Sequence, residues 1–221
     1  YQNIEGYKNS DHAIKWCLEA ANQGDPSAQY ALYTLLKLKK ESLKWLEKSA
    51  NQGYQKAVNQ LGLVYYEMAK ESKIDYSQAF QWLRKAKKYE NVTIDLYLAN
   101  CHYYAQGTQK DLKKAYKFYS RWEKKTGEVM SEEVIFNFGN YFYYGEDQGL
   151  GIELFKRICL KTENNEVLKS LAKIFRENNL YADAFEVELR MGQQGDQSVY
   201  LTIADAYSDG IGVAKDVKKS L

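Results

Sequence analysis

Two closely related strings of nine residues lie near the start of the chain. The first runs Trp-Cys-Leu-Glu-Ala-Ala-Asn-Gln-Gly from Trp16 to Gly24, and the second runs Trp-Leu-Glu-Lys-Ser-Ala-Asn-Gln-Gly from Trp45 to Gly53. Weaker copies follow around Trp82, Phe118, Leu154 and Val187. Self-similarity at an interval of about 20–50 residues is the signature of a repeat protein, in which each repeat packs only on its neighbours. We therefore expect a stack of similar units rather than one central core.

Each recurring position lies in a pattern of helical period. Around Trp82, for example, Ala79, Leu83 and Ala86 complete the spacing i, i+3, i+4 and i+7 of one helix face. We call the helices that carry these positions the anchor helices, and we expect the aromatic anchors to hold them in place. Glycines are expected to end three of them in the left-handed conformation. These glycines are Gly24, Gly53 and Gly195.

A second set of helices, which we call the intervening helices, is expected between the anchor helices. They should begin near Ala28, Ala57, Ile94, Val134, Val167 and Val199. The fifth residue after the mark is Gly or Ala in most repeats, namely Gly62, Ala99, Gly139, Ala172 and Ala204. Small side chains let two helix backbones approach closely. We therefore expect these positions to contact the anchor helices.

Three motifs follow this scheme. They are Leu-Gly-x-x-Tyr ending at Tyr65, Gly-x-Gly-Val before Asp-x-x-Lys from Gly210 to Lys219, and Ala-x-x-Trp at Trp16 followed by Gly24. In these features the chain resembles the Sel1-like repeat family, which is related to the tetratricopeptide repeats. The resemblance covers nearly the whole chain and implies an all-α fold, a right-handed α-solenoid of about six helix-turn-helix repeats. It also implies that the intervening helices line the concave side.

We interpret residues 1–221 as a single Sel1-like repeat solenoid. Both ends of the sequence fall inside a repeat. An uncapped end of a solenoid exposes apolar surface. We therefore expect this chain to be part of a longer protein.

The charge balance narrows the choice of partner. The chain has 31 Lys and Arg against 29 Asp and Glu, a net charge of +2. Proteins that bind phosphate backbones are usually much more basic, so nucleic acid is not the expected partner. No apolar run approaches the roughly 18 residues that a membrane-spanning helix needs. We expect a protein or peptide partner and a soluble chain, either cytoplasmic or bacterial periplasmic or secreted, whose oligomeric state stays open.

Residues that carry enzyme chemistry are few. The chain has two histidines, His12 and His102, and three cysteines, Cys17, Cys101 and Cys159. Cys101 and His102 are adjacent on a helix and point in different directions, with no third group to orient them. The Gly-x-Gly of the last loop follows a helix and lacks the lysine and serine of a phosphate-binding loop. We predict no catalytic site, no metal and no cofactor.

The intervening helices offer the surface best suited to binding. At 100° per residue, Asn59 and Tyr66 point away from the face that meets the anchor helix. The same row carries aromatic residues and Asn in the middle repeats, and three cations in the fifth. Tyr and Asn suit a peptide, and the cations suit an acidic side chain or a terminal carboxylate. The predicted groove consists of Asn59, Tyr66, Asn100, Tyr103, Phe136, Asn140, Tyr143, Lys169, Lys173 and Arg176.

Two sets of alternatives stay open. An aromatic stripe at helical spacing is more often core than binding surface, so Tyr66, Tyr103 and Tyr143 serve packing in the other interpretation. For the function, we predict a non-catalytic scaffold or adaptor that binds a protein or peptide in its concave groove. The alternatives are a carbohydrate-binding or envelope polysaccharide-export assembly module, and the regulatory arm of an enzyme whose catalytic domain lies outside this chain.

Overall fold

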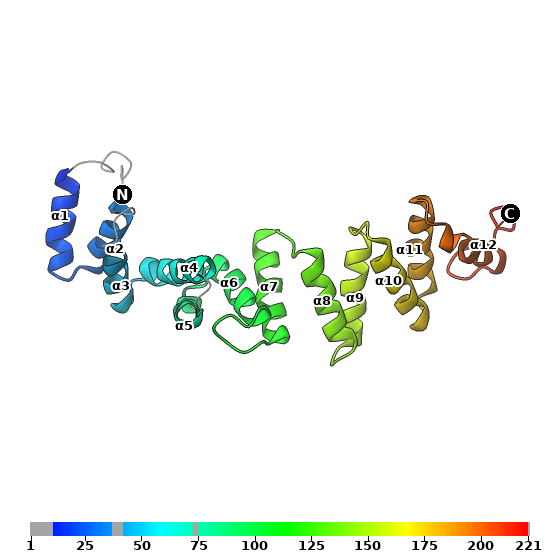
Figure 1. Cartoon of the computed structure of the whole chain (residues 1–221), viewed down its shortest axis with the longest axis horizontal. Helices are drawn as coiled ribbons and strands as arrows, with labels where there is room; N and C mark the ends of the chain where they lie inside the picture. The colour runs from blue at the N-terminus through cyan, green and yellow to red at the C-terminus, as the bar shows by residue number, and fades with distance from the viewer. Residues whose placement is uncertain (1–10, 37–41, 73–74, 221) are drawn as a thin grey trace. The chain divides into compact units, whose positions relative to one another are not determined.

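A computed structural model describes residues 11–36, 42–72 and 75–220. Within these ranges the chain forms twelve α-helices and two short 3-10 turns, and no strand (Figure 1). The predicted all-α fold of paired helices is confirmed.

The helices alternate between the two predicted sets. The anchor helices are α1 (Asp11–Asn22), α3 (Ser42–Asn51), α5 (Ser77–Ala86), α7 (Leu112–Thr126), α9 (Gln148–Cys159) and α11 (Tyr181–Gln193). The intervening helices are α2 (Pro26–Leu35), α4 (Gln55–Ser72), α6 (Val92–Tyr103), α8 (Glu132–Tyr143), α10 (Asn165–Glu177) and α12 (Tyr200–Asp209). The 3-10 turns are η2 (Lys87–Tyr89) and η3 (Gln197–Val199).

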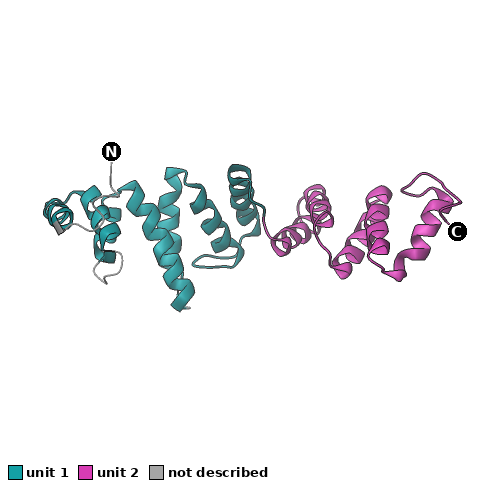
Figure 2. Cartoon of the chain, turned by 90° about the horizontal axis from the view of Figure 1, so that it is seen from above, with its two compact units in different colours: residues 1–129 teal, residues 130–221 magenta. Residues whose placement is uncertain are grey.

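The chain divides into two compact units, residues 1–129 and residues 130–221 (Figure 2). In unit 1, α2 packs on α3, α4 on α5, and α6 on α7. In unit 2, α8 packs on α9, and α10 on α11. Each of these pairs is an intervening helix with the anchor helix that follows it. The helical hairpin is therefore the packing element that repeats along the chain.

Small residues allow the two helices of a hairpin to approach closely, as the sequence predicts. A Cβ atom added at Gly62 would lie 3.1 Å from the backbone nitrogen of Leu83. A Cβ atom at Gly139 would overlap the ring of Phe155. Because side chains in a core are close-packed, a larger residue at either position must displace the anchor helix or its side chain.

The predicted helix ends are also present. Gly24 and Gly53 have φ values of +96° and +82°, the left-handed conformation in which a glycine ends a helix. Asp25 then caps α2, because its carboxylate accepts a hydrogen bond of 2.6 Å from the backbone nitrogen of Ala28. Pro26 occupies the first turn of α2, where its missing N–H group costs nothing.

The repeated tryptophan contributes less to the core than expected. Trp16 is 70% exposed, and Trp45 and Trp82 are only half-buried. The leucine directly after a tryptophan, Leu46 or Leu83, is instead fully buried. The string therefore marks the anchor helix correctly, but the side chain that holds the helix in place lies one position later.

In two of the loops that lead from an intervening helix to the next anchor helix, a glycine makes a close backbone contact. Gly107 has a φ of +69°, and a Cβ atom there would overlap the backbone carbonyl of Tyr76, which directly precedes α5. Gly212 has a φ of +77° and approaches the carbonyl of Tyr181, the first residue of α11, in the same way. Both loops thus fold back over the start of the preceding anchor helix, where only glycine fits.

Candidate functional site

A hollow of about 400 Å³ opens between α4 and α6 in unit 1. We call it the tyrosine hollow. Its lining consists of Tyr66, Glu67 and Lys70 from α4, Leu96, Tyr97 and Asn100 from α6, and Tyr104 and Gln106 from the segment after α6.

Two tyrosine rings form the wall of the hollow. The rings of Tyr66 and Tyr97 meet edge to face, with centroids 4.7 Å apart and planes at 88°. This geometry is favourable because the positive edge of one ring meets the negative face of the other. The contact joins α4 to α6 and so fixes the width of the hollow.

Hydrogen bonds hold the polar groups of this wall. The Tyr66 hydroxyl donates to Oε1 of Gln106 at 2.6 Å, and the Tyr97 hydroxyl donates to Oε1 of Glu67 at 3.0 Å. Burial raises the pKa of Tyr66, so its hydroxyl stays protonated and keeps donating. Asn100 of α6 accepts a hydrogen bond from the hydroxyl of Tyr119.

The mouth of the hollow is open to solvent. The Tyr104 side chain is 54% exposed, and the Lys70 ammonium lies 3.9 Å from the Glu67 carboxylate in an exposed pair. The Gln106 side-chain nitrogen makes no hydrogen bond within the described residues. A ligand in the hollow would therefore meet an aromatic surface, an amide donor, a cation and a carboxylate.

The structure brings together only some of the residues predicted for unit 1. Tyr66 and Asn100 line the tyrosine hollow, but Tyr103 and Asn59 are not part of its lining. Tyr66 and Tyr103 are both 6% exposed, so most of each ring serves packing. The ring of Tyr103 lies against Tyr104, with centroids 4.7 Å apart.

In unit 2 the predicted aromatic residues lie on α8. The rings of Phe136 and Tyr143 lie 6.0 Å and 5.6 Å from the Phe155 ring of α9. The Tyr143 hydroxyl accepts a hydrogen bond of 2.7 Å from the side-chain nitrogen of Asn178, which follows α10. Asn140 is half-buried on the same helix. These side chains therefore combine packing with a partly exposed edge.

The three predicted cations of α10 each have a carboxylate partner. Lys169 lies 3.2 Å from Asp196 and 3.5 Å from Glu166, and Lys173 lies 3.9 Å from Glu177. The Arg176 guanidinium donates two hydrogen bonds, of 2.8 Å and 2.6 Å, to the buried carboxylate of Glu188 on α11, which raises the pKa of Arg176. An acidic ligand would have to compete with these internal partners.

Sequence reasoning missed the part of the hollow that comes from outside the helical row. Tyr104 and Gln106 follow the last turn of α6, so the period of 100° per residue cannot predict where their side chains point. A signal was nevertheless present, since the pair Tyr103-Tyr104 recurs as Tyr143-Tyr144. In both pairs the second ring is exposed.

The described residues contain no group of three His, Cys, Asp or Glu side chains that could hold a metal ion. Burial raises the pKa values of the Cys101 and Cys159 thiols to about 12, so both stay protonated at neutral pH, whereas nucleophilic attack needs the thiolate. None of the described helices combines the length and the apolar character needed to cross a membrane.

Helical hairpins that repeat along the chain, with a hollow between successive intervening helices, define an α-helical repeat protein. The Sel1 repeat family model matches residues 5–25, 35–54, 55–88, 96–125 and 203–221, more than half of the sequence. The chain therefore belongs to the Sel1 repeat family. Proteins of this family generally act as scaffolds for protein interactions.

The chain is also similar to a curated protein and to two solved structures. An uncharacterized Sel1-like repeat-containing protein of Schizosaccharomyces pombe is 26% identical over 177 residues, which are 72% of this chain and 26% of that protein. The chain thus spans about a quarter of the length of this relative. A Sel1 repeat protein from Oxalobacter formigenes has a similar fold, with a TM-score of 0.52, 18% identity, and 94% of this chain and 63% of that one covered. A protective antigen of uropathogenic Escherichia coli strains with an SLR fold gives a TM-score of 0.46 at 20% identity, covering 96% of this chain and 47% of the antigen.

Proposed function

We propose that this chain is a non-catalytic scaffold that binds a protein or peptide segment through its intervening helices, with the tyrosine hollow of unit 1 as the principal contact. The observation that carries the proposal is the mixture of groups at the mouth of the hollow. Tyr104 supplies exposed aromatic surface, Gln106 supplies a donor, and Lys70 and Glu67 supply opposite charges.

This combination suits a peptide for a physical reason. An extended peptide offers carbonyl oxygens and amide hydrogens at regular intervals, and it needs partners for both. The Gln106 amide can donate to a carbonyl, while Glu67 can accept from an amide. Tyrosine adds contact area at a low cost in conformational entropy, because it has only two side-chain torsions.

We extend the proposal to the corresponding face of unit 2. There, α8 carries Phe136, Asn140 and Tyr143 at the positions that Leu96, Asn100 and Tyr103 hold on α6. The cations of α10 follow in the next repeat. Because Lys169 and Lys173 are exposed and their ion pairs are weak, an acidic side chain of a partner can replace Glu166 or Glu177 at little cost.

A selection from a random peptide library on the full chain tests this function. We expect peptides that bind the wild type and that lose about tenfold or more in affinity when Tyr104→Ala is combined with Gln106→Ala, because a buried aromatic contact and a hydrogen bond are both lost. Fluorescence anisotropy with the selected peptides measures the loss. Gln106→Ala also removes the acceptor of the buried Tyr66 hydroxyl, which should lower stability by about 1–3 kcal/mol, so affinity is measured well below the melting temperature of the variant.

Tyr200→Ala is the matched control, because Tyr200 is a tyrosine of similar exposure, 49%, at the start of α12 in unit 2. It should leave peptide affinity unchanged. Selected peptides that ignore the double variant would contradict the proposal for unit 1. If a glycan array gives ligands that depend on Tyr104 while the peptide library gives none, the surface binds carbohydrate instead.

A further inference from the structure

A second concave site lies in unit 1, on the other side of α6 from the tyrosine hollow. Its volume is about 570 Å³, within the usual range of small-molecule sites. Leu98 and His102 of α6 line it, whereas Leu96, Tyr97 and Asn100 line the hollow. At 100° per residue these two sets fall on opposite faces of one helix, so the two sites share no residue of α6.

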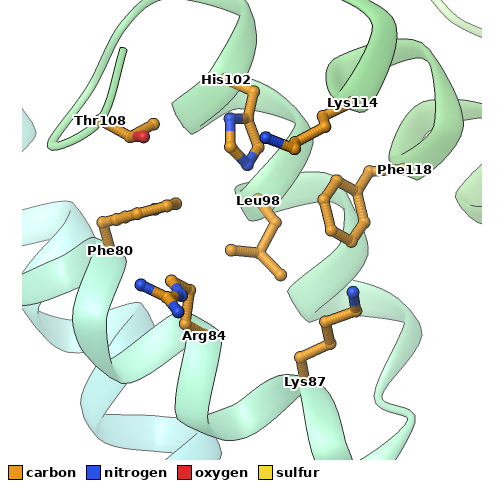
Figure 3. Close-up of a pocket in the computed structure, with 8 residues that line it drawn as sticks. All are labelled: Phe80, Arg84, Lys87, Leu98, His102, Thr108, Lys114 and Phe118. Carbon is orange, nitrogen blue, oxygen red and sulfur yellow. The ribbon is translucent and has the colours of Figure 1, made fainter. Parts of the chain in front are cut away.

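The site joins an apolar wall to a basic rim, and we call it the basic pocket. Phe80 of α5, Leu98 of α6 and Phe118 of α7 supply the apolar wall. Arg84, Lys87, His102, Thr108 and Lys114 supply the polar groups. Figure 3 shows these side chains around one common space, with Arg84 and Lys87 on one side and His102 and Lys114 on the other.

Aromatic rings hold two of the cations at the pocket. The Lys87 ammonium lies 4.8 Å from the ring centroid of Phe118, and the Arg84 guanidinium lies 5.8 Å from that of Phe80. Neither cation has a carboxylate partner within the described part of the chain. Cation–π contacts position a charge without neutralising it. Both charges are therefore available to an anion.

His102 and Lys114 complete the polar side. His102 is only 8% exposed, and its Nδ1 atom is buried without a hydrogen-bond partner in the described residues. Its ring lies between Phe80, at 5.5 Å, and Phe118, at 5.9 Å. Lys114 pairs with Asp111 at 2.9 Å. Three cations thus face one carboxylate, which leaves the pocket with a net positive charge.

The last repeat shows that the fold does not require these polar residues. The repeat that contains the basic pocket aligns in sequence with the last repeat when residue 76 is placed against residue 181, an offset of 105 residues. The framework is kept as the pairs Tyr76 and Tyr181, Phe80 and Phe185, Gly107 and Gly212, Asp111 and Asp216, and Lys114 and Lys219. The polar lining is replaced, because Arg84, Lys87, His102 and Thr108 correspond to Leu189, Gly192, Tyr207 and Val213.

The packing is the same in spite of these replacements. The rings of Phe80 and His102 meet at 89° with centroids 5.5 Å apart, and those of Phe185 and Tyr207 meet at 83° and 5.2 Å. A histidine is thus not needed to fill this space. Among the polar residues of the pocket, only His102 has a buried atom without a partner in the described part of the chain, its Nδ1, and such an atom is costly unless something binds it.

We propose that the basic pocket binds a small organic phosphate, namely a phosphate monoester on an apolar or aromatic body. The phosphate lies among Arg84, Lys87 and Lys114, and His102 and Thr108 donate further hydrogen bonds to it. The apolar body packs against Phe80, Leu98 and Phe118. A monoester fits better than a carboxylate because its dianion matches the three cations.

Titration calorimetry of the full chain with phenyl phosphate tests the proposal, with inorganic phosphate as the probe that lacks the apolar body. We expect phenyl phosphate to bind about tenfold or more tightly than inorganic phosphate, because burial of the ring adds favourable transfer free energy. Arg84→Leu with Lys87→Ala should weaken phenyl phosphate binding by about tenfold or more, since two charge-assisted contacts are lost.

The matched control is Lys85→Leu with Lys88→Ala, which removes the same charge from the same segment. Lys85 and Lys88 lie over Trp82 and Tyr89, outside the pocket lining. This variant should bind phenyl phosphate within about twofold of the wild type, as expected for solvent-screened charges that do not line the pocket. An equal loss in the two double variants, or equal affinity for the two probes, would overturn the proposal.

The two histidines provide a site-specific readout. On titration with phenyl phosphate, the side-chain nuclear magnetic resonance signals of His102 should shift, and those of His12 should not. An unchanged His102 signal at saturation places the ligand elsewhere and refutes the site.

A pH series with phenyl sulfate, whose charge is constant from about pH 8 to pH 5, adds a test of His102 itself. Burial lowers the pKa of His102 in the free chain, and Lys114 and Lys87 lower it further, whereas Asp111 and a hydrogen bond with the Gln109 backbone oppose them. An anion favours the protonated ring, so affinity should rise as the pH falls. His102→Tyr should abolish this rise, and a rise that persists in the variant contradicts the assigned role.

Discussion

Gly107 lies over the start of α5 in one repeat, and Gly212 lies over the start of α11 in another, with nearly the same left-handed φ. Around them the framework residues agree. The residues around the pocket differ. Arg84 and Lys87 line the basic pocket, whereas the equivalent residues of the last repeat are Leu189 and Gly192.

This comparison separates two kinds of position within one molecule. The shared glycines place backbone against backbone, where sterics leave little choice. The positions that differ line the basic pocket, and the last repeat shows that the packing tolerates their replacement. Comparison of two repeats within one chain therefore distinguishes the residues that the fold requires from those that it does not.

Substitution of the shared glycine should give the largest effect. Gly107→Val forces a β-branched residue into the left-handed region and against the fixed Tyr76 carbonyl, which should cost about 3–4 kcal/mol of unfolding free energy. Urea denaturation measures this loss. Gly212→Val meets the same clash at Tyr181. A change of less than about 1 kcal/mol in both variants would contradict the clash, and a large loss in only one of them would break the equivalence of the two loops.

The contact between the helices of a hairpin should give the next largest effect. Gly139→Leu places a side chain where Phe155 already lies and should cost on the order of 1–3 kcal/mol through overpacking. Gly62→Ala is the milder counterpart, because its Cβ atom would meet Leu83 at 3.1 Å, a tight contact but a less severe one than that with the Phe155 ring. In thermal denaturation, Gly139→Leu should have a lower melting temperature than Gly62→Ala. The opposite order would contradict the helix contact described for α8 and α9.

The exchange of His102 for the residue of the last repeat should give the smallest effect. Because burial lowers the pKa of His102, the unfolded chain binds a proton at a higher pH than the folded chain. This group therefore lowers stability as the pH falls below 6.5, the ordinary histidine value. His102→Tyr should remove that pH-dependent component while stability at pH 7 changes by less than about 1 kcal/mol. Urea denaturation at both ends of the range measures the difference, and an unchanged pH slope would show that His102 is not buried as described.

Most of the fold could be read from the sequence because repetition multiplies weak signals. The spacing of small residues placed Gly62 and Gly139 at the hairpin contacts, and glycines after the anchors placed the helix ends. The repeated tryptophans predicted the wrong buried side chain, because the leucine after the tryptophan fills the core instead. A helix wheel identifies a face but not which of two adjacent large residues points inward, and that choice depends on the packing angle.

The candidate site was less predictable. Tyr66 and Asn100 were found because they lie on one helical row, while Tyr104 and Gln106 come from the segment after α6 and escape any helical period. The internal partners of Lys169 and Arg176 come from Asp196 and Glu188, in the following turns and helices. Sequence spacing alone cannot say which carboxylate a long cation will reach.

The four tryptophans, at positions 16, 45, 82 and 122, have a consequence for observing this molecule. All of them lie in unit 1, residues 1–129, and they range from exposed Trp16 to buried Trp122. Selective excitation of indole therefore reports on unit 1 alone, whereas the helical circular dichroism signal sums over both units. If the two units melt separately, the two spectroscopic curves will not coincide, and the wild-type chain needs no added label to reveal it.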